Sequence, residues 1–277
     1  MVHILYCGNV GVFDGLLTSA LSAMKRTSSR EPFCFHVFTM DVSHLNGKYL
    51  PINDRQISFF ERVVKGCNEE NEVRVYDVTA LYMRDFSGCP NESAYCSPYT
   101  LIRLFADEFP ELPDKLLYLD ADVMFNRDVH LLWDIDVENY EYAAARDHYG
   151  KYLIYPNYIN AGVLLFNMTK ARQTGLFKKA RAILKEKKLV FADQSAIIRA
   201  RTKRKVLPQR FNDQKFLHKH TVIRHFSKRL FYLPYPHTEN VKQWQVDRVH
   251  KIFRYHQFDD VLEEYQKLIE QYKNEVR

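Results

Sequence analysis

The chain has 277 residues, of which 46% are hydrophobic and 14% aromatic, and its formal net charge is +6. This length and composition can bury a large core, as one domain or one domain with an appendage, and they exclude a disordered chain. The longest apolar runs, such as residues 161–166, are far shorter than the ~20 residues of a membrane-spanning helix. The N-terminal MVHILYCGN lacks the charged region and long apolar stretch of a signal peptide, so we expect a cytoplasmic protein.

The charges are distributed unevenly. Residues 168–231 contain 19 Lys or Arg and three acidic residues, so this segment carries +16 and the rest of the chain −10. Such a segment is typical of a solvated basic face or of a protein with an anionic partner, such as a phosphate-bearing ligand or an anionic membrane surface. We do not expect nucleic acid as the partner, because no motif has the spacing of a known nucleic-acid reader.

The cysteines do not form a recognisable framework. Five are present and none belongs to a C-x-x-C pair: Cys7, Cys34, Cys67, Cys89 and Cys96. An odd set with this spacing argues against both a disulfide scaffold and a thiolate zinc site, so we expect reduced thiols.

In chain order, short β-rich runs alternate with segments of helical periodicity, a pattern typical of a mostly parallel sheet covered by helices on both faces. Strands are predicted at residues 2–8, 33–40, 72–78, 115–120, 142–146, 162–166 and 221–226. Helices are predicted at residues 15–26, with Asp14 as N-cap, and at 52–64, 99–109, 169–187 and 193–200.

A further helix is predicted over residues 258–276 near the C-terminus. Its apolar stripe consists of Val261, Leu262, Tyr265, Leu268, Ile269 and Tyr272. The polar face of this helix is acidic on balance, so we expect it to dock on its own domain rather than on an anionic membrane.

Asp120 and Asp122 end the apolar strand KLLYLD and its continuation. Ligands of open α/β sheets bind beyond the carboxyl ends of the strands, and two carboxylates spaced i, i+2 can bind one hard cation such as Mg²⁺ or Mn²⁺. A calcium loop is excluded because Met124 stands where a ligand is needed and Phe125 where the turn glycine belongs. From these residues alone, two solvated loop acids remain the alternative.

Several further segments follow one another along the chain: SPYTLIRLFADEFPELPDKLLYLDADVMFNRDVHLLW from Ser97, then YINAGVLLFNM, FADQSAI, LPQRFN and VIRHF. Together they make the chain resemble glycosyltransferase family 8, whose members are retaining enzymes of the GT-A fold that use a nucleotide sugar and a divalent cation. The resemblance covers most of residues 97–226. It implies an α/β fold of GT-A type, with a mixed, mostly parallel sheet flanked by helices and a C-terminal helical extension.

The resemblance also implies a metal site. Asp120, Asp122 and His225 of VIRHF would bind Mn²⁺, with Mg²⁺ as the alternative, and this mixed carboxylate and imidazole set suits Mn²⁺. The family commonly continues with a compact H-x-x-G-x-x-K-P-W block. Here HFSKRLFYLPYPHTENVKQW contains an insertion, Gln243 in place of the proline and a second candidate ligand, His237.

Further residues correspond to donor-binding positions of the family. Asp120 and Ala121 would contact the ribose, and Arg103 of Y-x-x-x-R would bind phosphate or sugar hydroxyls, its alternative being an exposed helix charge. Lys242 is the expected diphosphate ligand, with Lys228 as the alternative. Near the first strand, YCGNVGVFD lacks the family's acidic base-binding residue, so Asn9 is the remaining candidate.

The donor sugar would lie against YINAG and FADQS, where Gly162 permits a close backbone approach. The expected contacts are Asn160, Ala161, Gly162, Asp193 and Gln194. Asp193 could also cap the following helix. Gln194, expected near the anomeric carbon, is a poor nucleophile, so we favour a same-face route, with Asp147 and Asp193 as the carboxylates to test for covalent catalysis.

The implied reaction is transfer of a hexose, glucose or galactose, from a UDP-sugar to a hydroxyl of a glycan or glycolipid, as in the synthesis of cell-envelope polysaccharide of the lipopolysaccharide kind. A nucleotidyltransferase and a catalytically silent glycan- or nucleotide-binding relative are the alternatives. We expect residues 1–226 to form the transferase domain and residues 227–277 an extension that closes over the donor site. The basic segment favours work at the inner face of an anionic membrane.

Overall fold

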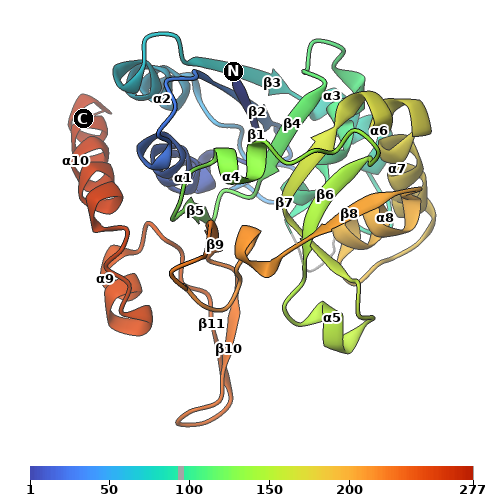
Figure 1. Cartoon of the computed structure of the whole chain (residues 1–277). Helices are drawn as coiled ribbons and strands as arrows, with labels where there is room; N and C mark the ends of the chain where they lie inside the picture. Colours follow the sequence, from blue (N-terminus) through green and yellow to red (C-terminus); the bar gives the residue numbers. More distant parts are fainter. Residues whose placement is uncertain (93–96, 277) are drawn as a thin grey trace.

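The computed structural model describes residues 1–92 and 97–276. Within these residues the central element is a seven-stranded sheet with the order β3-β2-β1-β4-β7-β6-β8 (Figure 1). Its strands are β1 (Val2–Cys7), β2 (Phe33–Thr39), β3 (Glu72–Asp77), β4 (Lys115–Leu119), β6 (Tyr142–Arg146), β7 (Ile159–Asn167) and β8 (Arg204–Leu207). Only β7 runs antiparallel to its neighbours. The predicted mostly parallel α/β sheet is therefore confirmed.

The central strands of the sheet are buried on both faces, which explains why they read as continuous apolar runs. Along β1, Ile4 and Tyr6 point into one core and Leu5 and Cys7 into the other. The first core is covered by α1 (Phe13–Arg26), α2 (Asp54–Cys67) and α10 (Asp259–Val276). The second is covered by α3 (Thr79–Phe86), η3 (Ile102–Glu108), α7 (Leu176–Glu186) and α8 (Ala192–Ala200).

Three helix predictions need correction. Asp14 is not an N-cap, because the 3-10 turn η1 (Val10–Val12) leads directly into α1 and Asp14 lies in the first turn of α1. The helix predicted at 99–109 is two 3-10 helices, η2 (Pro98–Thr100) and η3. The predicted basic helix is broken into α6 (Met168–Thr174) and α7, because Gly175 adopts the left-handed conformation with φ 68° and ends the first helix.

The late strand predicted at 221–226 forms as the shorter β9 (Ile223–His225), but not in the main sheet. It pairs antiparallel with β5 (Val123–Phe125), a strand that was not predicted. Other elements that were not predicted are α3, β8 and several short elements: α4 (His130–Trp133), α5 (Gly150–Leu153), η4 (Gln209–Phe211), α9 (Val246–Arg248) and the π-helical turn η5 (Val249–Phe253).

The insertion after His225 forms an antiparallel hairpin of β10 (Arg229–Phe231) and β11 (His237–Glu239), which projects from the body of the molecule (Figure 1). The chain then returns to the core as α10, whose predicted apolar stripe is confirmed: Val261, Leu262 and Tyr265 are buried against the first core. Among the residues described, no helix combines the length and apolarity that crossing a membrane requires. Cys7, Cys34, Cys67 and Cys89 are free thiols, and Cys96 lies outside the described residues.

Candidate active site

The D-x-D segment is held between two strands from distant parts of the sequence. Asp120 follows the last residue of β4, and its backbone N–H donates to the Gly162 carbonyl on β7 at 2.8 Å. Asp122 precedes β5, and its carbonyl accepts from the Phe226 N–H just after β9, also at 2.8 Å. Because Val123 pairs with His225 in the β5–β9 ladder, the imidazole lies beside both carboxylates.

Asp120, Asp122 and His225 form a compact cluster of metal-ligand type, with one ligand atom of each residue within 4.8 Å of the others. His225 Nε2 lies 3.0 Å from Asp122 Oδ1 and 3.8 Å from Asp120 Oδ2. The alternative ligand His237 is on β11, where its Nδ1 bonds the Tyr235 carbonyl at 2.8 Å. Of the two candidate histidines, His225 is therefore the one that the fold brings to the aspartates.

A chain of hydrogen bonds defines the tautomer of His225. The Gly162 N–H donates to Asn160 Oδ1 at 2.9 Å, so the amide nitrogen of Asn160 faces the Asp147 carboxylate at 2.9 Å. Asn160 Oδ1 also accepts from the amide nitrogen of Asn212 at 2.8 Å, which turns Asn212 Oδ1 toward His225 Nδ1, 3.0 Å away. Nδ1 therefore donates to Asn212, and Nε2 is the ring nitrogen that faces the aspartates.

The residues present fit a divalent cation. Two carboxylates and the Nε2 atom of an imidazole face one another, and such a set of electron-pair donors suits a positive ion. Oxygen ligands with one imidazole suit Mn²⁺, and Mg²⁺ also accepts carboxylate oxygens. The bonded Asn212 side chain provides the outer-shell orientation that ligating histidines usually have.

Arg103 is buried, with 2% of its surface exposed, so the alternative of an exposed helix charge is wrong. Its guanidinium donates to Asp120 Oδ1 at 3.0 Å and to the Ala161 carbonyl at 2.5 Å, and it stacks 3.9 Å above the ring of Tyr118. The Tyr118 hydroxyl donates to the same Oδ1 at 2.6 Å. With Oδ1 engaged twice, the Oδ2 atom of Asp120 is the one directed to His225.

Lys242 reaches the site from the C-terminal segment. Its ammonium group donates to Asp122 Oδ2 and to the Phe226 carbonyl, the latter at 3.2 Å. Although burial acts to raise the pKa of Asp122, Lys242 and His225 outweigh it and hold that pKa well below its usual range. Asp122 is therefore ionised throughout the physiological pH range.

Gln243, which stands in place of the family's proline, makes hydrogen bonds that a proline could not make. The side chain is fully buried, and its amide nitrogen donates to the Ala121 carbonyl at 2.7 Å and to Thr18 Oγ1 at 3.0 Å. These bonds tie the C-terminal segment to α1 and to the middle of the D-x-D loop. Close packing continues at Gly15, where a Cβ would come within 2.6 Å of Trp244.

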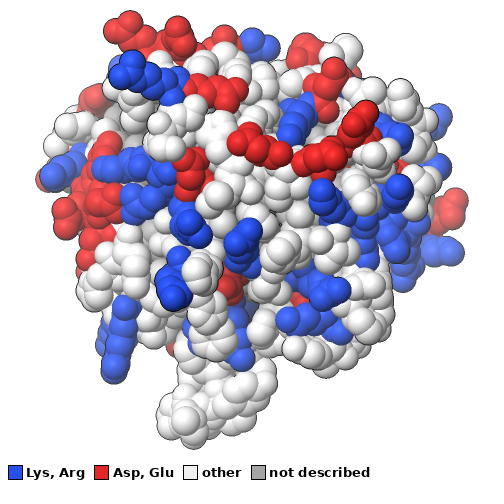
Figure 2. All heavy atoms as spheres, in the orientation of Figure 1, with Lys and Arg blue, Asp and Glu red and all other residues white. Residues whose placement is uncertain are grey.

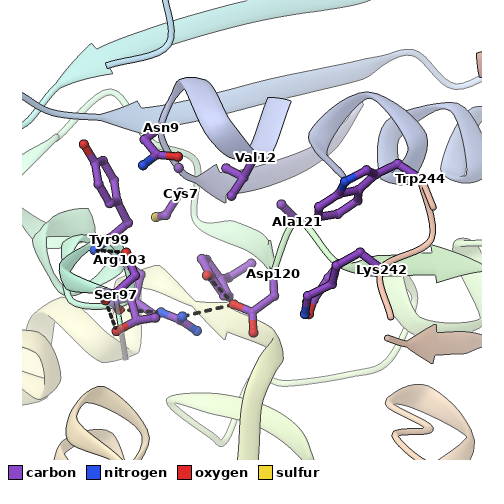
Figure 3. Close-up of a pocket in the computed structure, with 14 residues that line it drawn as sticks. Cys7, Asn9, Val12, Ser97, Tyr99, Arg103, Asp120, Ala121, Lys242 and Trp244 are labelled. Atoms are coloured by element: carbon purple, nitrogen blue, oxygen red, sulfur yellow. Dashed lines mark hydrogen bonds and ion pairs between the residues drawn. The ribbon is translucent and has the colours of Figure 1, made fainter. Parts of the chain in front are cut away.

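A cavity of about 210 Å³ opens beside the cluster (Figure 3). Of the predicted site residues, it is lined by Asn9, Arg103, Asp120, Ala121, Asp122 and Lys242. Sequence reasoning missed other lining residues, chiefly Cys7, Ser97, Tyr99, Thr100, Tyr118 and Trp244. Tyr99 belongs to the Y-x-x-x-R segment and Trp244 to the K-Q-W segment, from which only Arg103 and Lys242 were selected. Their position inside these motifs could have identified them as lining residues.

The YINAG and FADQS segments lie together on the other side of Arg103. The Ala161 N–H donates to Gln194 Oε1 at 3.0 Å, and Asp193 Oδ2 lies 3.4 Å from Arg103 Nε. Burial raises the pKa of Asp193, although Arg103 opposes the shift. Asp193 does not cap α8, because Phe191 is the N-cap residue and Asp193 lies in the first turn.

Gly162 is required by the cluster itself. A Cβ on this residue would lie 2.7 Å from Asp120 Oδ2 and closer still to His225 Cε1.

Asp147 lies at the far end of the hydrogen-bond chain, where its carboxylate accepts from the N–H groups of Tyr149 at 3.0 Å and Gly150 at 2.6 Å. Gln214 adds a donor at 3.3 Å. With the Asn160 amide as well, Asp147 accepts four hydrogen bonds, so its carboxylate stabilises the surrounding backbone and side chains.

Comparison with known proteins agrees with this fold. Residues 3–230 match the sequence model of Glycosyl transferase family 8, and the chain belongs to this family. A Haemophilus influenzae protein named as a glycosyltransferase is 29% identical over 146 residues, 46% of this chain and 44% of its own. Glycosyltransferase GlyA of Streptococcus pneumoniae is 25% identical over 197 residues, 70% of this chain and 25% of its own. The chain thus aligns with less than half the length of these curated relatives.

Solved structures share the fold. The galactosyltransferase LgtC, determined in complex with donor and acceptor sugar analogs, is 21% identical with a TM-score of 0.68, covering 96% of this chain and 95% of its own. The bifunctional glycosyltransferase WbbM is 17% identical with a TM-score of 0.72, covering 98% of this chain and 51% of its own. The expected GT-A architecture is confirmed.

Proposed function

We propose that the protein is a metal-dependent retaining hexosyltransferase that moves glucose or galactose from a UDP-sugar to a hydroxyl of a glycan or glycolipid. The observation that carries this proposal is the cluster of Asp120, Asp122 and His225 beside a cavity large enough for part of a nucleotide. Family membership and the crystal complex of LgtC with donor and acceptor sugar analogs support the same class of reaction.

The cavity suggests how the donor is bound. Asn9 is at one end of the cavity and Lys242 at the other (Figure 3), so we assign Asn9 to the base, Asp120 and Ala121 to the ribose, and Lys242 to the diphosphate. Arg103 holds Asp120 and the Ala161 carbonyl in place, and because it also lines the cavity we propose that it contacts the donor as well. We propose Asn160, Ala161 and Gly162 as the surface that faces the transferred sugar.

Asp120, Asp122 and His225 would hold the cation, for which we propose Mn²⁺ with Mg²⁺ as a substitute. When bound, the cation neutralises negative charge on the diphosphate leaving group. Lys242, which already donates to Asp122, adds a second positive charge on the same side of the cavity. The protein thus concentrates positive charge where the departing phosphate becomes more negative.

For the transfer we favour attack on the same face from which UDP departs. The bond from the anomeric carbon to the phosphate oxygen breaks, the acceptor oxygen bonds to that carbon, and the acceptor proton passes to the departing phosphate. Gln194 is an amide and Asp147 is saturated with hydrogen-bond donors, so neither is suited to form a covalent intermediate. Asp193, paired with Arg103, is the remaining carboxylate. A glycosyl adduct on Asp147 or Asp193, detected by mass spectrometry, would contradict this route.

We also propose that residues 227–277 form an extension that closes over the donor site, because Lys242 and Trp244 line the cavity from this segment. The basic segment of residues 168–231 supports a place in the cytoplasm, at the inner face of an anionic membrane. Such a place suits an acceptor that is a lipid-linked glycan of the cell envelope.

Incubation of the protein with UDP-glucose or UDP-galactose and Mn²⁺ tests the proposal. We expect slow release of UDP and free hexose, lost on addition of chelator, with an α-anomer formed first as seen by proton NMR. Release of pyrophosphate would instead identify a nucleotidyltransferase. Tight UDP binding without turnover on any donor or acceptor would identify a silent relative.

A further inference from the structure

The hairpin that replaces the family's compact block carries an exposed apolar tip. Residues 232–236, here called the hairpin tip, read YLPYP, and Tyr232, Leu233 and Tyr235 are 64%, 84% and 66% exposed. In the space-filling view the hairpin is an uncharged projection below the body of the molecule (Figure 2). Side chains this apolar are costly to leave in water, and a contiguous exposed group of them marks an interaction surface.

The tip is not isolated. The α5 turn next to the hairpin exposes Tyr152, Leu153 and Ile154, at 78%, 80% and 49%. The two elements are linked, because the Leu230 N–H donates to the Tyr149 hydroxyl at 3.2 Å. Three aliphatic and three aromatic side chains therefore face solvent from two adjoining elements.

Basic side chains gather next to this apolar surface. A cavity of about 400 Å³ lies beside α5 and is lined by Lys151, Arg210, Lys215 and three histidines, against a single acid, Asp213. The Asp213 carboxylate accepts from the Phe216 N–H at 3.1 Å and from Thr221 Oγ1 at 3.2 Å. Its charge is thus directed into the protein, and the cavity presents a positive surface.

We infer that the hairpin tip and α5 insert into an anionic lipid bilayer, with the basic cavity at the level of the lipid phosphates. Apolar side chains with aromatic neighbours and a basic surround are the composition of an interfacial membrane contact. Leu153, Ile154 and Leu233 have no polar group with which to bind a sugar, and two copies of a basic surface would repel each other. The charge therefore favours a bilayer over a glycan or a second copy.

This inference rests on the proposed function and deepens it. The hairpin begins at Arg229, four residues after His225, and ends at Glu239, three residues before Lys242. Both ends are thus rooted at the candidate active site. About five residues per arm at about 3.3 Å each reach roughly 15 Å, so a docked enzyme holds its candidate active site close to the membrane. The acceptor class that fits is a lipid-linked glycan whose reacting hydroxyl lies close to the bilayer surface.

Vesicle flotation tests the inference. Wild type should float with phosphatidylcholine vesicles that contain phosphatidylglycerol, less so with neutral vesicles, and progressively less as salt is added. Replacing the tip by Tyr232→Ser, Leu233→Ser and Tyr235→Ser should lower the partition coefficient about tenfold or more. Leu131→Ser on α4, where the parent leucine is 41% exposed, is the matched control and should float like wild type.

A second variant reports insertion directly. Leu233→Trp should show a blue shift of tryptophan emission on anionic vesicles, after subtraction of the wild-type spectrum. The inference is overturned if wild type and the tip variant float equally, or if added salt does not change flotation. It is also overturned if the emission shifts with a soluble glycan or with protein concentration instead of with vesicles. The three substituted residues do not line the donor cavity, unlike Lys242 and Trp244 of the same segment. UDP binding in the presence of Mn²⁺ should therefore be unchanged in the tip variant, so loss of membrane binding and failure of the proposed function are separable.

Discussion

The hydrogen bond from His225 to Asn212 should control metal affinity. In Asn212→Ala, His225 Nδ1 loses its acceptor, and the proton is free to move to Nε2. Asp122 Oδ1, 3.0 Å from Nε2, would then accept it in a hydrogen bond. A hydrogen bond to a carboxylate stabilises that competing tautomer by about 1.5–3 kcal/mol. The cation must displace this proton, so we expect Mn²⁺ affinity to fall about 10- to 100-fold.

The loss of free Mn²⁺ signal in electron paramagnetic resonance measures this affinity without turnover. Asn212→Asp keeps an acceptor on Nδ1 and should bind Mn²⁺ nearly as wild type does, although it faces Asn160 Oδ1 and should unfold at lower urea. Asn126→Ala is the control, because Asn126 bonds the Thr221 carbonyl at 3.0 Å and does not touch a ligand. The reasoning is refuted if Asn212→Ala binds Mn²⁺ as tightly as wild type, or if the alanine and aspartate variants lose affinity equally.

Three further outcomes are expected. Gly162→Ala should abolish Mn²⁺ binding, because its Cβ overlaps the ligands, and wild-type affinity would show that the cluster can shift. Burial, aided by His3 and Arg74, lowers the pKa of His36 to about 3, so below pH ~6.5 the unfolded chain gains a proton that the folded chain does not. Urea unfolding should therefore show stability falling by about 2 kcal/mol from pH 7 to pH 5, and the same slope in His36→Gln would contradict this origin. Lys242→Gln should weaken UDP about tenfold or more while sparing uridine, and Lys228→Gln should change neither; the reverse pattern would assign the diphosphate to Lys228.

The central strands of the sheet could be predicted because they are buried on both faces, whereas the short, partly exposed edge strand β8 was missed. Runs such as FCFHVFT have no competing pattern, and β2 is buried throughout. Helix ends were predicted less well. Asp14 satisfies the composition of an N-cap, but the chain enters α1 through a 3-10 turn and leaves it no such place. Gly175 inside the basic segment was a visible signal for a break, since glycine readily adopts the left-handed conformation.

Site residues that belong to a recognisable motif could be predicted from the sequence. Residues that only the fold brings to the site could not. Asp120, Asp122 and His225 come together only through the β5–β9 ladder, whose three-residue strands carry no periodicity that a sequence can show. The resemblance to a family replaced that missing information. Asn212 belongs to the LPQRFN segment, but its role depends on amide orientations set by Gly162 and Asp147, which no local pattern encodes.

The most direct test of the central claim is calorimetric titration of UDP into the protein with Mn²⁺, with chelator, and with Asp122→Asn in place of wild type. The geometry around Asp122 predicts tight binding only when the metal and the aspartate are both present. UDP binding that ignored both, or no binding at all, would contradict a nucleotide-sugar metal site at the end of β4.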